Sequence, residues 1–235
     1  MGTELYYYYY YYSRRPLLLS MIIVIMLTLP CCGVSAAAEL WWQSSPPEKR
    51  SLYLAFVKAS CEKDCLHPSM CLEQLSPHAD QIQGSKRRLA AFALQLSQAS
   101  VKAAKDVILR KLASEAPTTE KEHSAMSDCR EAVGNAADGI KGSLPPLAHA
   151  ETGSPDEFGA TMNDVLTWVS AALTDLDTCL DGLREAAAAS SDLGGQVEFA
   201  SNLTSISLAM ITSFAALGPA PCPKTHQLFY NDDLP

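Results

Sequence analysis

The chain has 235 residues, of which 48% are hydrophobic, and its 18 basic and 26 acidic side chains give a net charge of −8 at pH 7. This length suits one domain of ordinary size, with two small domains as the upper bound. The acidic balance argues against nucleic acid and anionic membranes as partners. It is compatible with a basic protein partner or with solubility alone.

The first 38 residues predict a low-complexity N-terminus followed by a secretory signal peptide. A run of tyrosines covers residues 6–12, and we assign it no function. Arg14 and Arg15 then precede a short apolar stretch that is followed by small residues up to Ala38. This order is typical of a signal peptide, and the apolar stretch is short for a membrane anchor. We expect cleavage after Ala36 or Ala38, secretion, and no stable membrane insertion of the mature chain.

Residues 39–50 are predicted to be a linker, because two tryptophans are followed there by Ser-Ser-Pro-Pro. The folded domain is expected over residues 51–217, and a flexible tail over residues 218–235. Between residues 51 and 84, cysteines and prolines interrupt every long pattern. We therefore expect short helical pieces joined by turns in that part of the domain.

Four longer helices are expected after residue 84. The first covers about residues 85–114, and its apolar stripe contains Leu89, Phe92, Leu96, Ala99 and Ala103. The second opens with a capping box at residues 119–122 and is expected to stop before the two prolines at 145 and 146.

The third helix opens with a capping box at residues 154–157, has proline at its first position, and is expected to run to about residue 189. The fourth should follow the two glycines at 194 and 195 and end at the Gly-Pro pair at 218–219. Its apolar stripe consists of Phe199, Leu203, Ile206, Met210, Phe214 and Leu217.

The third helix carries the clearest pattern in the chain. Its apolar residues recur at steps of three and four, and they are Val165, Trp168, Val169, Ala172, Leu176, Cys179, Leu180 and Leu183. Cys179 therefore lies on the predicted buried face, with Thr178 beside it. Asp175, Asp177 and Asp181 are expected to point to other sides.

No stretch shows sustained alternation of β-branched residues, so strands have little support. Long helices joined by short loops predict an all-α fold, an antiparallel up-down-up-down four-helix bundle.

The eight cysteines indicate disulfides. Cys31 and Cys32 would leave with the signal peptide, and an even number remains, which in a secreted chain is typical of a disulfide framework. The remaining cysteines are Cys61, Cys65, Cys71, Cys129, Cys179 and Cys222. Their pairing cannot be read from the count, and a buried Cys179 could be core filler or half of a cross-link.

No constellation predicts catalysis, a metal site or a cofactor. The five histidines stand in no pattern with a nucleophile, and no phosphate-binding glycine loop is present. The spacing of Cys61, Cys65, His67 and Cys71 matches no zinc module that we can defend. The acidic residues near Asp175 lack the glycine and glutamate of a calcium loop. One glycosylation sequon is present, at Asn202-Leu-Thr204.

Several cysteine-containing segments together resemble the plant invertase and pectin methylesterase inhibitor family. The resemblance covers about residues 51–217, and its last segment is the most specific. These segments are Val57-Lys-Ala-Ser-Cys61, His67-Pro-x-x-Cys71, Leu75-Ser-Pro-His-Ala79, Asp128-Cys129-x-Glu131 and Ser170-Ala-Ala-Leu-Thr-Asp-x-Asp-Thr-Cys-Leu-Asp-Gly182.

The resemblance implies an N-terminal helical hairpin packed on the four-helix bundle, with both parts stapled by disulfides. It implies a Cys61–Cys71 disulfide in the hairpin and a Cys129–Cys179 disulfide between the second and third bundle helices. In the family the first pair usually lies one residue closer together, and here Cys65 lies between its members. A Cys65–Cys71 pair therefore stays open. Cys65 could also pair with Cys222, or both could be free or intermolecular thiols.

The resemblance also implies a protein partner, either pectin methylesterase or acid invertase. Invertase inhibitors share a Pro-Lys-Phe element in the loop before the last helix, and residues 189–196 lack it here. In pectin methylesterase inhibitors, a threonine directly before the third-helix cysteine lies at the enzyme contact, and Thr178 matches it. A hydroxyl bonded back to its own helix is an equally good reading of Thr178.

The function implied is a secreted, apoplastic inhibitor that is not an enzyme. It would occlude the pectin-binding cleft of pectin methylesterase in a one-to-one complex and so modulate cell-wall pectin methylesterification. Thr178, Asp175 and Asp177 would contribute to partner binding, since acidic side chains facing a basic enzyme rim steer association. The alternatives are inhibition of cell-wall or vacuolar acid invertase, or a structural or maturation bundle.

Overall fold

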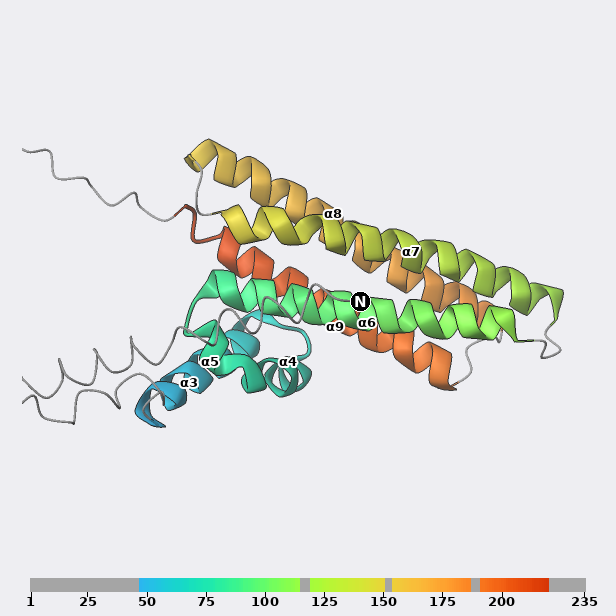
Figure 1. The fold of residues 1–235 in the computed structure, drawn as a ribbon, viewed down its shortest axis with the longest axis horizontal. Coiled ribbons are helices and arrows are strands. Elements are labelled where there is room, and N and C mark those ends of the chain that lie inside the picture. Colours follow the sequence, from blue (N-terminus) through green and yellow to red (C-terminus); the bar gives the residue numbers. More distant parts are fainter. Residues whose placement is uncertain (1–46, 115–118, 151–153, 187–190, 220–235) are drawn as a thin grey trace, which may run out of the picture. The chain divides into compact units, whose positions relative to one another are not determined.

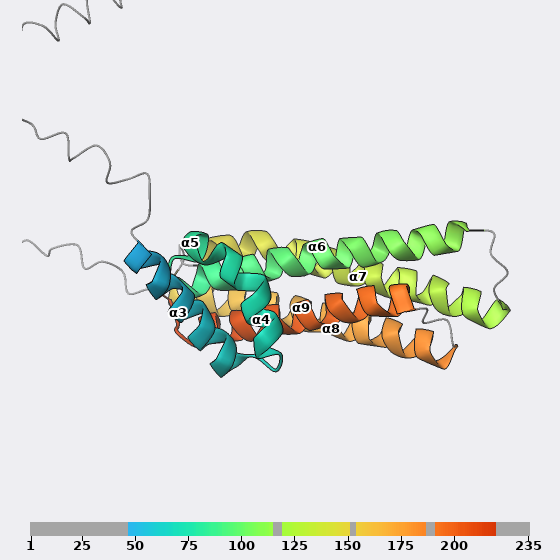
Figure 2. The same ribbon diagram turned by 90° about the horizontal axis from the view of Figure 1, so that it is seen from below.

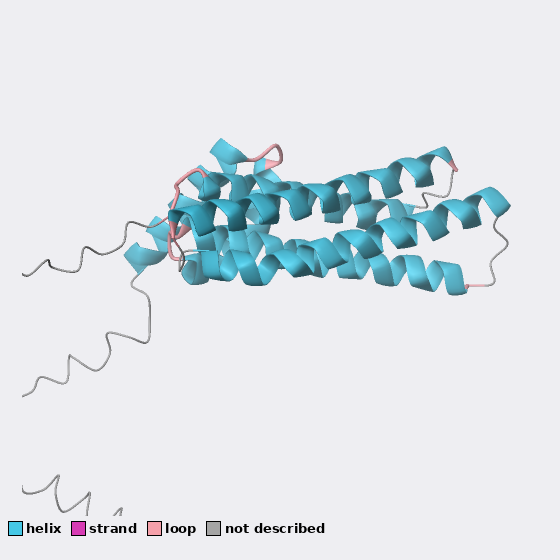
Figure 3. Cartoon of the chain, turned by 90° about the horizontal axis from the view of Figure 1, so that it is seen from above, coloured by secondary structure: helices cyan, strands magenta, loops and turns pink. Residues whose placement is uncertain are grey.

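The computed structural model describes residues 47–114, 119–150, 154–186 and 191–219, which all belong to one compact unit of the chain, Ser45–Pro235. The expectations for the signal peptide, the start of the linker, Cys222 and most of the tail lie outside these residues. Every regular element in the described ranges is helical, which confirms the all-α prediction (Figure 3). Among these helices, none is both long enough and apolar enough to cross a bilayer.

Four long helices form the predicted bundle (Figure 1). Contacts join each helix to the next along the chain and the last to the first, which closes the ring. The antiparallel up-down-up-down order of the prediction is confirmed. The helices are α6 (Lys86–Ala113), α7 (Glu120–His149), α8 (Pro155–Glu185) and α9 (Ser191–Ala215).

The starts of α7 and α8 are fixed by side chains that the sequence predicts. Thr119 accepts a hydrogen bond from the backbone N–H of Glu122, and the Glu122 carboxylate accepts one from the backbone N–H of Thr119. Ser154 and Glu157 form the same reciprocal pair. Each cap satisfies backbone donors that the first helical turn would otherwise leave unpaired, which is worth about 1 kcal/mol.

The expected end of α7 is wrong, because the helix continues through Pro145 and Pro146 to His149. These prolines lack the N–H groups that would bond the carbonyls of Lys141 and Gly142, four residues earlier. Both of those residues are exposed, so water can reach the carbonyls. Continuing the helix places Leu147 in the core, where it is fully buried.

The expected boundaries around the last connection are also wrong. Helix α8 ends at Glu185 rather than near residue 189, and α9 begins at Ser191, before the two glycines at 194 and 195. Leu193 and Val197 are both fully buried. Burial of two large side chains outweighs the low helix propensity of the intervening glycines, which costs about 1 kcal/mol per glycine.

The predicted stripe of α6 is only partly right, since Ala99 and Ala103 are exposed. The core face instead contains Ala93 and Ser97. The hydroxyl of Ser97 lies 2.7 Å from that of Thr204 on α9, and both residues are fully buried. A hydroxyl pair of this kind satisfies two polar groups inside the core, so a polar residue occupies a position that the apolar pattern excludes.

The faces of α8 and α9 follow their predicted stripes, with exceptions at three residues. Trp168, Phe199 and Leu217 are exposed to solvent rather than buried. The remaining members of both stripes are buried in one continuous core.

A helical hairpin precedes the bundle, as expected. It consists of α3 (Pro47–Asp64), α4 (Pro68–Leu75), a 3₁₀ turn (Ser76–His78) and α5 (Ala79–Ile82). It packs at the end of the bundle where α6 begins and α9 ends (Figure 2).

Lys86 joins the hairpin to the bundle. Its Nζ donates to Asp64 at 2.9 Å and to Ser60 at 3.2 Å, both on α3, and to Ser213 on α9 at 3.0 Å. The ammonium also lies 5.7 Å from the centre of the Phe56 ring. Because Lys86 is the first residue of α6, one side chain connects three helices.

Candidate functional site

A disulfide between Cys129 and Cys179 connects α7 to α8. Both residues are buried, and their Cα atoms are 4.4 Å apart. Each cysteine stands on the face that its helix turns toward the neighbouring helix, which is where the apolar pattern of α8 places Cys179. This pairing is the one that the family resemblance implies.

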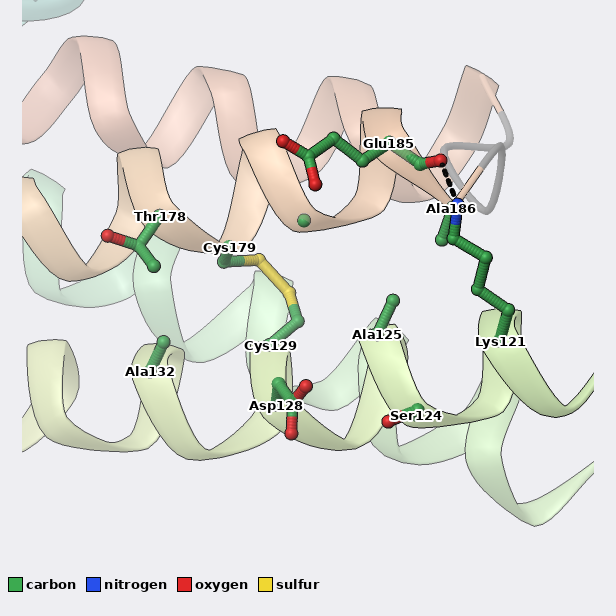
Figure 4. A pocket seen from close by; sticks show the side chains of 11 residues that line it. Lys121, Ser124, Ala125, Asp128, Cys129, Ala132, Thr178, Cys179, Glu185 and Ala186 are labelled. Carbon is green, nitrogen blue, oxygen red and sulfur yellow. Dashed lines mark hydrogen bonds between the residues drawn. A yellow bond between two sulfur atoms is a disulfide. The ribbon is translucent and has the colours of Figure 1, made fainter.

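A shallow groove of about 250 Å³ opens over this disulfide (Figure 4). At its end the Nζ of Lys121 donates to the carbonyl of Glu185 at 2.9 Å. Since Lys121 lies in the first turn of α7 and Glu185 ends α8, this bond closes the antiparallel pair and satisfies a terminal carbonyl. The lining residues are Lys121, Ser124, Ala125, Asp128, Cys129, Ala132, Thr178, Cys179, Gly182, Glu185 and Ala186.

Thr178 lines this groove and is exposed. Its hydroxyl donates to the carbonyl of Thr174 in the preceding turn at 2.8 Å. The sequence left two roles open for Thr178, an enzyme contact or a hydroxyl bonded to its own helix. The structure shows the bond to the helix. That bond uses the hydroxyl hydrogen and leaves the oxygen able to accept a hydrogen bond from outside.

The structure separates the two aspartates that the sequence places with Thr178. Asp175 is half-buried, and burial raises the pKa of its carboxyl above the usual value. On a helix, positions 175, 178 and 182 share one face, so Asp175 and Thr178 lie along the same side of α8. Asp177 lies on another side, where it accepts a hydrogen bond from Ser201 of α9 at 2.7 Å.

Trp168 is a candidate contact residue that the sequence pattern misses. It was assigned to the buried face, but 41% of its surface is exposed. A Cβ atom added at Gly139 of α7 would lie 3.2 Å from the carbonyl oxygen of Trp168, so the two helices approach closely here. Trp168 and Asp175 are seven residues apart and share one side of α8.

The other predicted site residues lie elsewhere. Cys61 and Cys71 form a disulfide within the hairpin, and Cys65 forms none with any described residue. Asn202 is half-exposed on α9, whereas Thr204 of the same sequon is fully buried. Across the described ranges, no group of three or more histidine, cysteine or acidic side chains is placed to hold a metal ion.

A family model described as plant invertase/pectin methylesterase inhibitor matches residues 55–210. The chain belongs to this family. The match spans the hairpin from within α3 and the bundle to within α9, and it includes both disulfides.

Two curated relatives are named as pectinesterase inhibitors. The chain is 36% identical over 171 residues to pectinesterase inhibitor 9 of Arabidopsis thaliana, which covers 68% of this chain and 80% of the relative. It is 35% identical over 165 residues to pectinesterase inhibitor 10 of the same plant, covering 69% of this chain. The chain spans about half the length of inhibitor 10, since 52% of that protein is covered.

A solved structure has the same fold. It is a crystal structure of a mutant form of a pectin methylesterase inhibitor from Arabidopsis, with a TM-score of 0.53 and 22% sequence identity. The match covers 65% of this chain and 92% of the solved one.

Proposed function

We propose that this protein is a secreted inhibitor of pectin methylesterase, with no catalytic activity of its own. The inhibitor would bind the enzyme beside its pectin cleft in a one-to-one complex and exclude the polymer. The observation that carries the proposal is the exposed Thr178, which stands next to the disulfide that joins α7 and α8. The inhibitor names of the curated relatives support the same conclusion.

The α7–α8 pair is a suitable surface for a protein partner because it is long and rigid. Helices of 30 and 31 residues are about 45 Å long, and the disulfide and the Lys121 bond hold them together. A preorganised surface loses little conformational entropy on binding. Affinity can therefore come from few anchoring side chains.

Trp168, Asp175 and Thr178 would supply such anchors along one side of α8. A partly exposed tryptophan offers a large apolar surface with a hydrogen-bond donor, and tryptophan is enriched among residues that dominate binding energy. Asp175 would face basic groups of the enzyme, which speeds association more than it fixes affinity. Asp177 would contribute through its charge, while its hydrogen bond to Ser201 holds α9 in place.

Acid invertase is the second candidate target, because the family includes inhibitors of both enzymes. Residues 189–196 lack the Pro-Lys-Phe element that invertase inhibitors share before the last helix. This absence favours pectin methylesterase over acid invertase. Helix α9 begins at Ser191, so part of that segment is helix rather than loop. A maturation or structural bundle is a further alternative.

Enzyme titration tests the proposal. We expect the mature protein to reduce methanol release from pectin by a purified plant pectin methylesterase to near zero at one molar equivalent. It should leave acid invertase active. A variant with Asp175→Asn, Asp177→Asn and Thr178→Ala should need at least tenfold more protein for the same inhibition. Wild-type potency of that variant would refute the proposed surface.

A charge-matched control separates local contact from general electrostatics. Asp106 on α6 and Asp138 on α7 are both exposed, and both line a different groove. The variant with Asp106→Asn and Asp138→Asn also removes two negative charges, but at positions outside the groove that Thr178 lines. Inhibition should stay at the wild-type level in this control. Inhibition of invertase instead of pectin methylesterase would support the second candidate and overturn the first.

A further inference from the structure

Another groove, of about 680 Å³, lies between the hairpin and the end of α9. Its lining includes the ion pair of Lys86 with Asp64, and also Leu208 and Thr212 of α9. This groove shares no lining residue with the one over the Cys129–Cys179 disulfide. The surface proposed for enzyme binding therefore does not account for it.

Two exposed leucines line the groove. Leu66 is 86% exposed and Leu217 is 65% exposed, which makes them the two most exposed large apolar side chains of the described residues. Leu66 follows α3, and Leu217 follows α9. Apolar side chains that gather at a groove, rather than standing alone, indicate a surface that something covers.

The sequence continues past the groove-lining Leu217 into a further segment. Helix α9 ends at Ala215, Gly218 turns with a φ of 71°, and residues 220–235 follow. That segment contains apolar residues in succession (Leu-Phe-Tyr at 228–230) and then two aspartates at 232 and 233. Lys63, on the groove rim, is exposed and forms no ion pair with any described residue. The segment thus matches the groove in both apolar character and charge.

The hairpin beside the groove and the segment 220–235 each contain a cysteine. Cys65 lies between Asp64 and Leu66, which both line the groove, and it is half-buried. Cys222 is the third residue after Pro219. Three residues span at most about 10 Å, so Cys222 lies within that reach of Pro219, two residues after the groove-lining Leu217.

We propose that residues 220–235 dock in the groove formed by Lys63, Asp64, Leu66, Leu208, Thr212 and Leu217, and that a Cys65–Cys222 disulfide closes the contact. An S–S bond forms as the two thiols lose two protons and two electrons. A disulfide oxidant, such as glutathione disulfide or a thiol–disulfide oxidoreductase, accepts the electrons and leaves as two thiols.

This bond would add a type of link that the described residues lack. The Cys61–Cys71 disulfide lies within the hairpin, and the Cys129–Cys179 disulfide lies within the bundle. Neither joins hairpin to bundle. A Cys65–Cys222 bond would connect the hairpin to the chain that follows α9, on the groove side of the Lys86 cluster.

Peptide mapping of the secreted protein without reduction tests the bond. After denaturation and alkylation of free thiols, a peptide cross-linked between Cys65 and Cys222 is expected at more than 90% occupancy. In the Cys222→Ser variant, the Cys65 peptide should carry the alkyl label instead. Alkylated Cys65 and Cys222 in the wild type, or a disulfide between two copies of the chain, would overturn the proposal.

Denaturation before alkylation is necessary in this map. Burial, with the nearby Asp64 charge, raises the pKa of the Cys65 thiol to about 11. A folded Cys222→Ser protein would therefore label slowly even though its thiol is free.

A second experiment tests docking apart from bond formation. The effective concentration of the two thiols in the folded protein equals the square of the reduced glutathione concentration divided by the oxidised glutathione concentration, at the point where the Cys65–Cys222 bond is half open. This relation holds because opening consumes two reduced glutathione molecules and releases one oxidised molecule. Replacing Leu66 and Leu217 by aspartate should lower this effective concentration at least tenfold. The control Leu109→Asp, at an exposed leucine of α6 outside the groove, should leave it unchanged. Equal values in all three proteins would show a free tail and overturn the docking. Both experiments stand whether or not the protein inhibits pectin methylesterase.

Discussion

Ser201 of α9 donates a hydrogen bond to the Asp177 carboxylate of α8 at 2.7 Å, whereas the hydroxyl of the neighbouring Thr178 donates to the Thr174 carbonyl of its own helix. Two adjacent residues therefore have different roles. Asp177 helps to hold α8 and α9 together, whereas the hydrogen bond of Thr178 joins two turns of the same helix. Any loss of inhibition on changing Asp177 must be separated from loss of stability.

Replacing Asp177 by alanine should lower the free energy of unfolding by about 1 kcal/mol, since a hydrogen bond to a charged group at a partly exposed site is lost. Thr178→Ala should change it by less than about 0.5 kcal/mol. Urea unfolding followed by circular dichroism measures both. Ser201→Ala combined with Asp177→Ala should cost no more than Asp177→Ala alone. Additive costs of the two single changes would contradict the bond.

Removing the Cys129–Cys179 disulfide should lower the free energy of unfolding by about 4 kcal/mol on the chain-entropy argument, because the bond closes a loop with a separation of 50 residues. Removing Cys61–Cys71, with a separation of 10, should cost about 3 kcal/mol. Calorimetry of the two paired cysteine-to-serine variants should show melting temperatures in that order. The idea fails if the Cys129→Ser, Cys179→Ser variant melts with the wild type.

Two glycines of α7 form a matched pair for testing the close helix approach. At Gly142 an added Cβ meets nothing within 4 Å, so Gly142→Ala should stabilise the protein by about 0.5–1 kcal/mol through helix propensity. At Gly139 the same atom would lie 3.2 Å from the Trp168 carbonyl oxygen. Gly139→Ala should therefore gain less than Gly142→Ala, or destabilise. Equal gains in thermal unfolding would show that α7 and α8 can separate without cost.

Acid should weaken the contact between hairpin and bundle. Burial alone would raise the pKa of Asp64, but hydrogen bonds from Lys86 and Ser213 and the charge of Lys86 hold it below its usual 3.8. A carboxyl whose pKa is lower in the folded state stabilises that state above about pH 4, and this stabilisation is lost as the pH falls through the folded pKa.

Asp64→Asn should remove this part of the pH dependence. Between pH 5 and pH 2, the free energy of unfolding of the wild type should fall more steeply than that of the variant. Asp106→Asn, at an exposed acid of α6, serves as the control and should keep the wild-type slope. Parallel curves for the wild type and Asp64→Asn would exclude a role for the Lys86–Asp64 pair in acid sensitivity.

Local signals in the sequence account for much of this fold. The capping boxes at Thr119 and Ser154 begin helices because their bonds involve residues three positions apart, which a sequence displays directly. The face of Cys179 follows from helical periodicity. Its pairing with Cys129 came from family resemblance, because no local rule specifies which cysteine lies opposite.

The wrong predictions arise where long-range packing outweighs local preference. Two consecutive prolines normally end a helix, yet α7 continues through Pro145 and Pro146, and Leu147 after them is buried. The exposure of Trp168 depends on where the neighbouring helices lie, and the apolar pattern of α8 alone does not show this. Asp177 likewise looks like a solvent-facing residue until α9 brings Ser201 beside it. Each of these positions needs the neighbouring helix before its role is visible.

The buried hydroxyl pair of Ser97 and Thr204 sets an order of events during biosynthesis. Thr204 belongs to the Asn202 sequon, and in the folded protein its hydroxyl is wholly buried and bonded to Ser97 of α6. An enzyme that reads the sequon hydroxyl can do so only before α9 packs on α6. Whether Asn202 carries a glycan would thus depend on the rate of sugar transfer relative to the rate at which α9 packs on α6. Glycan occupancy would then report how fast the bundle closes, with slower-folding variants carrying more sugar.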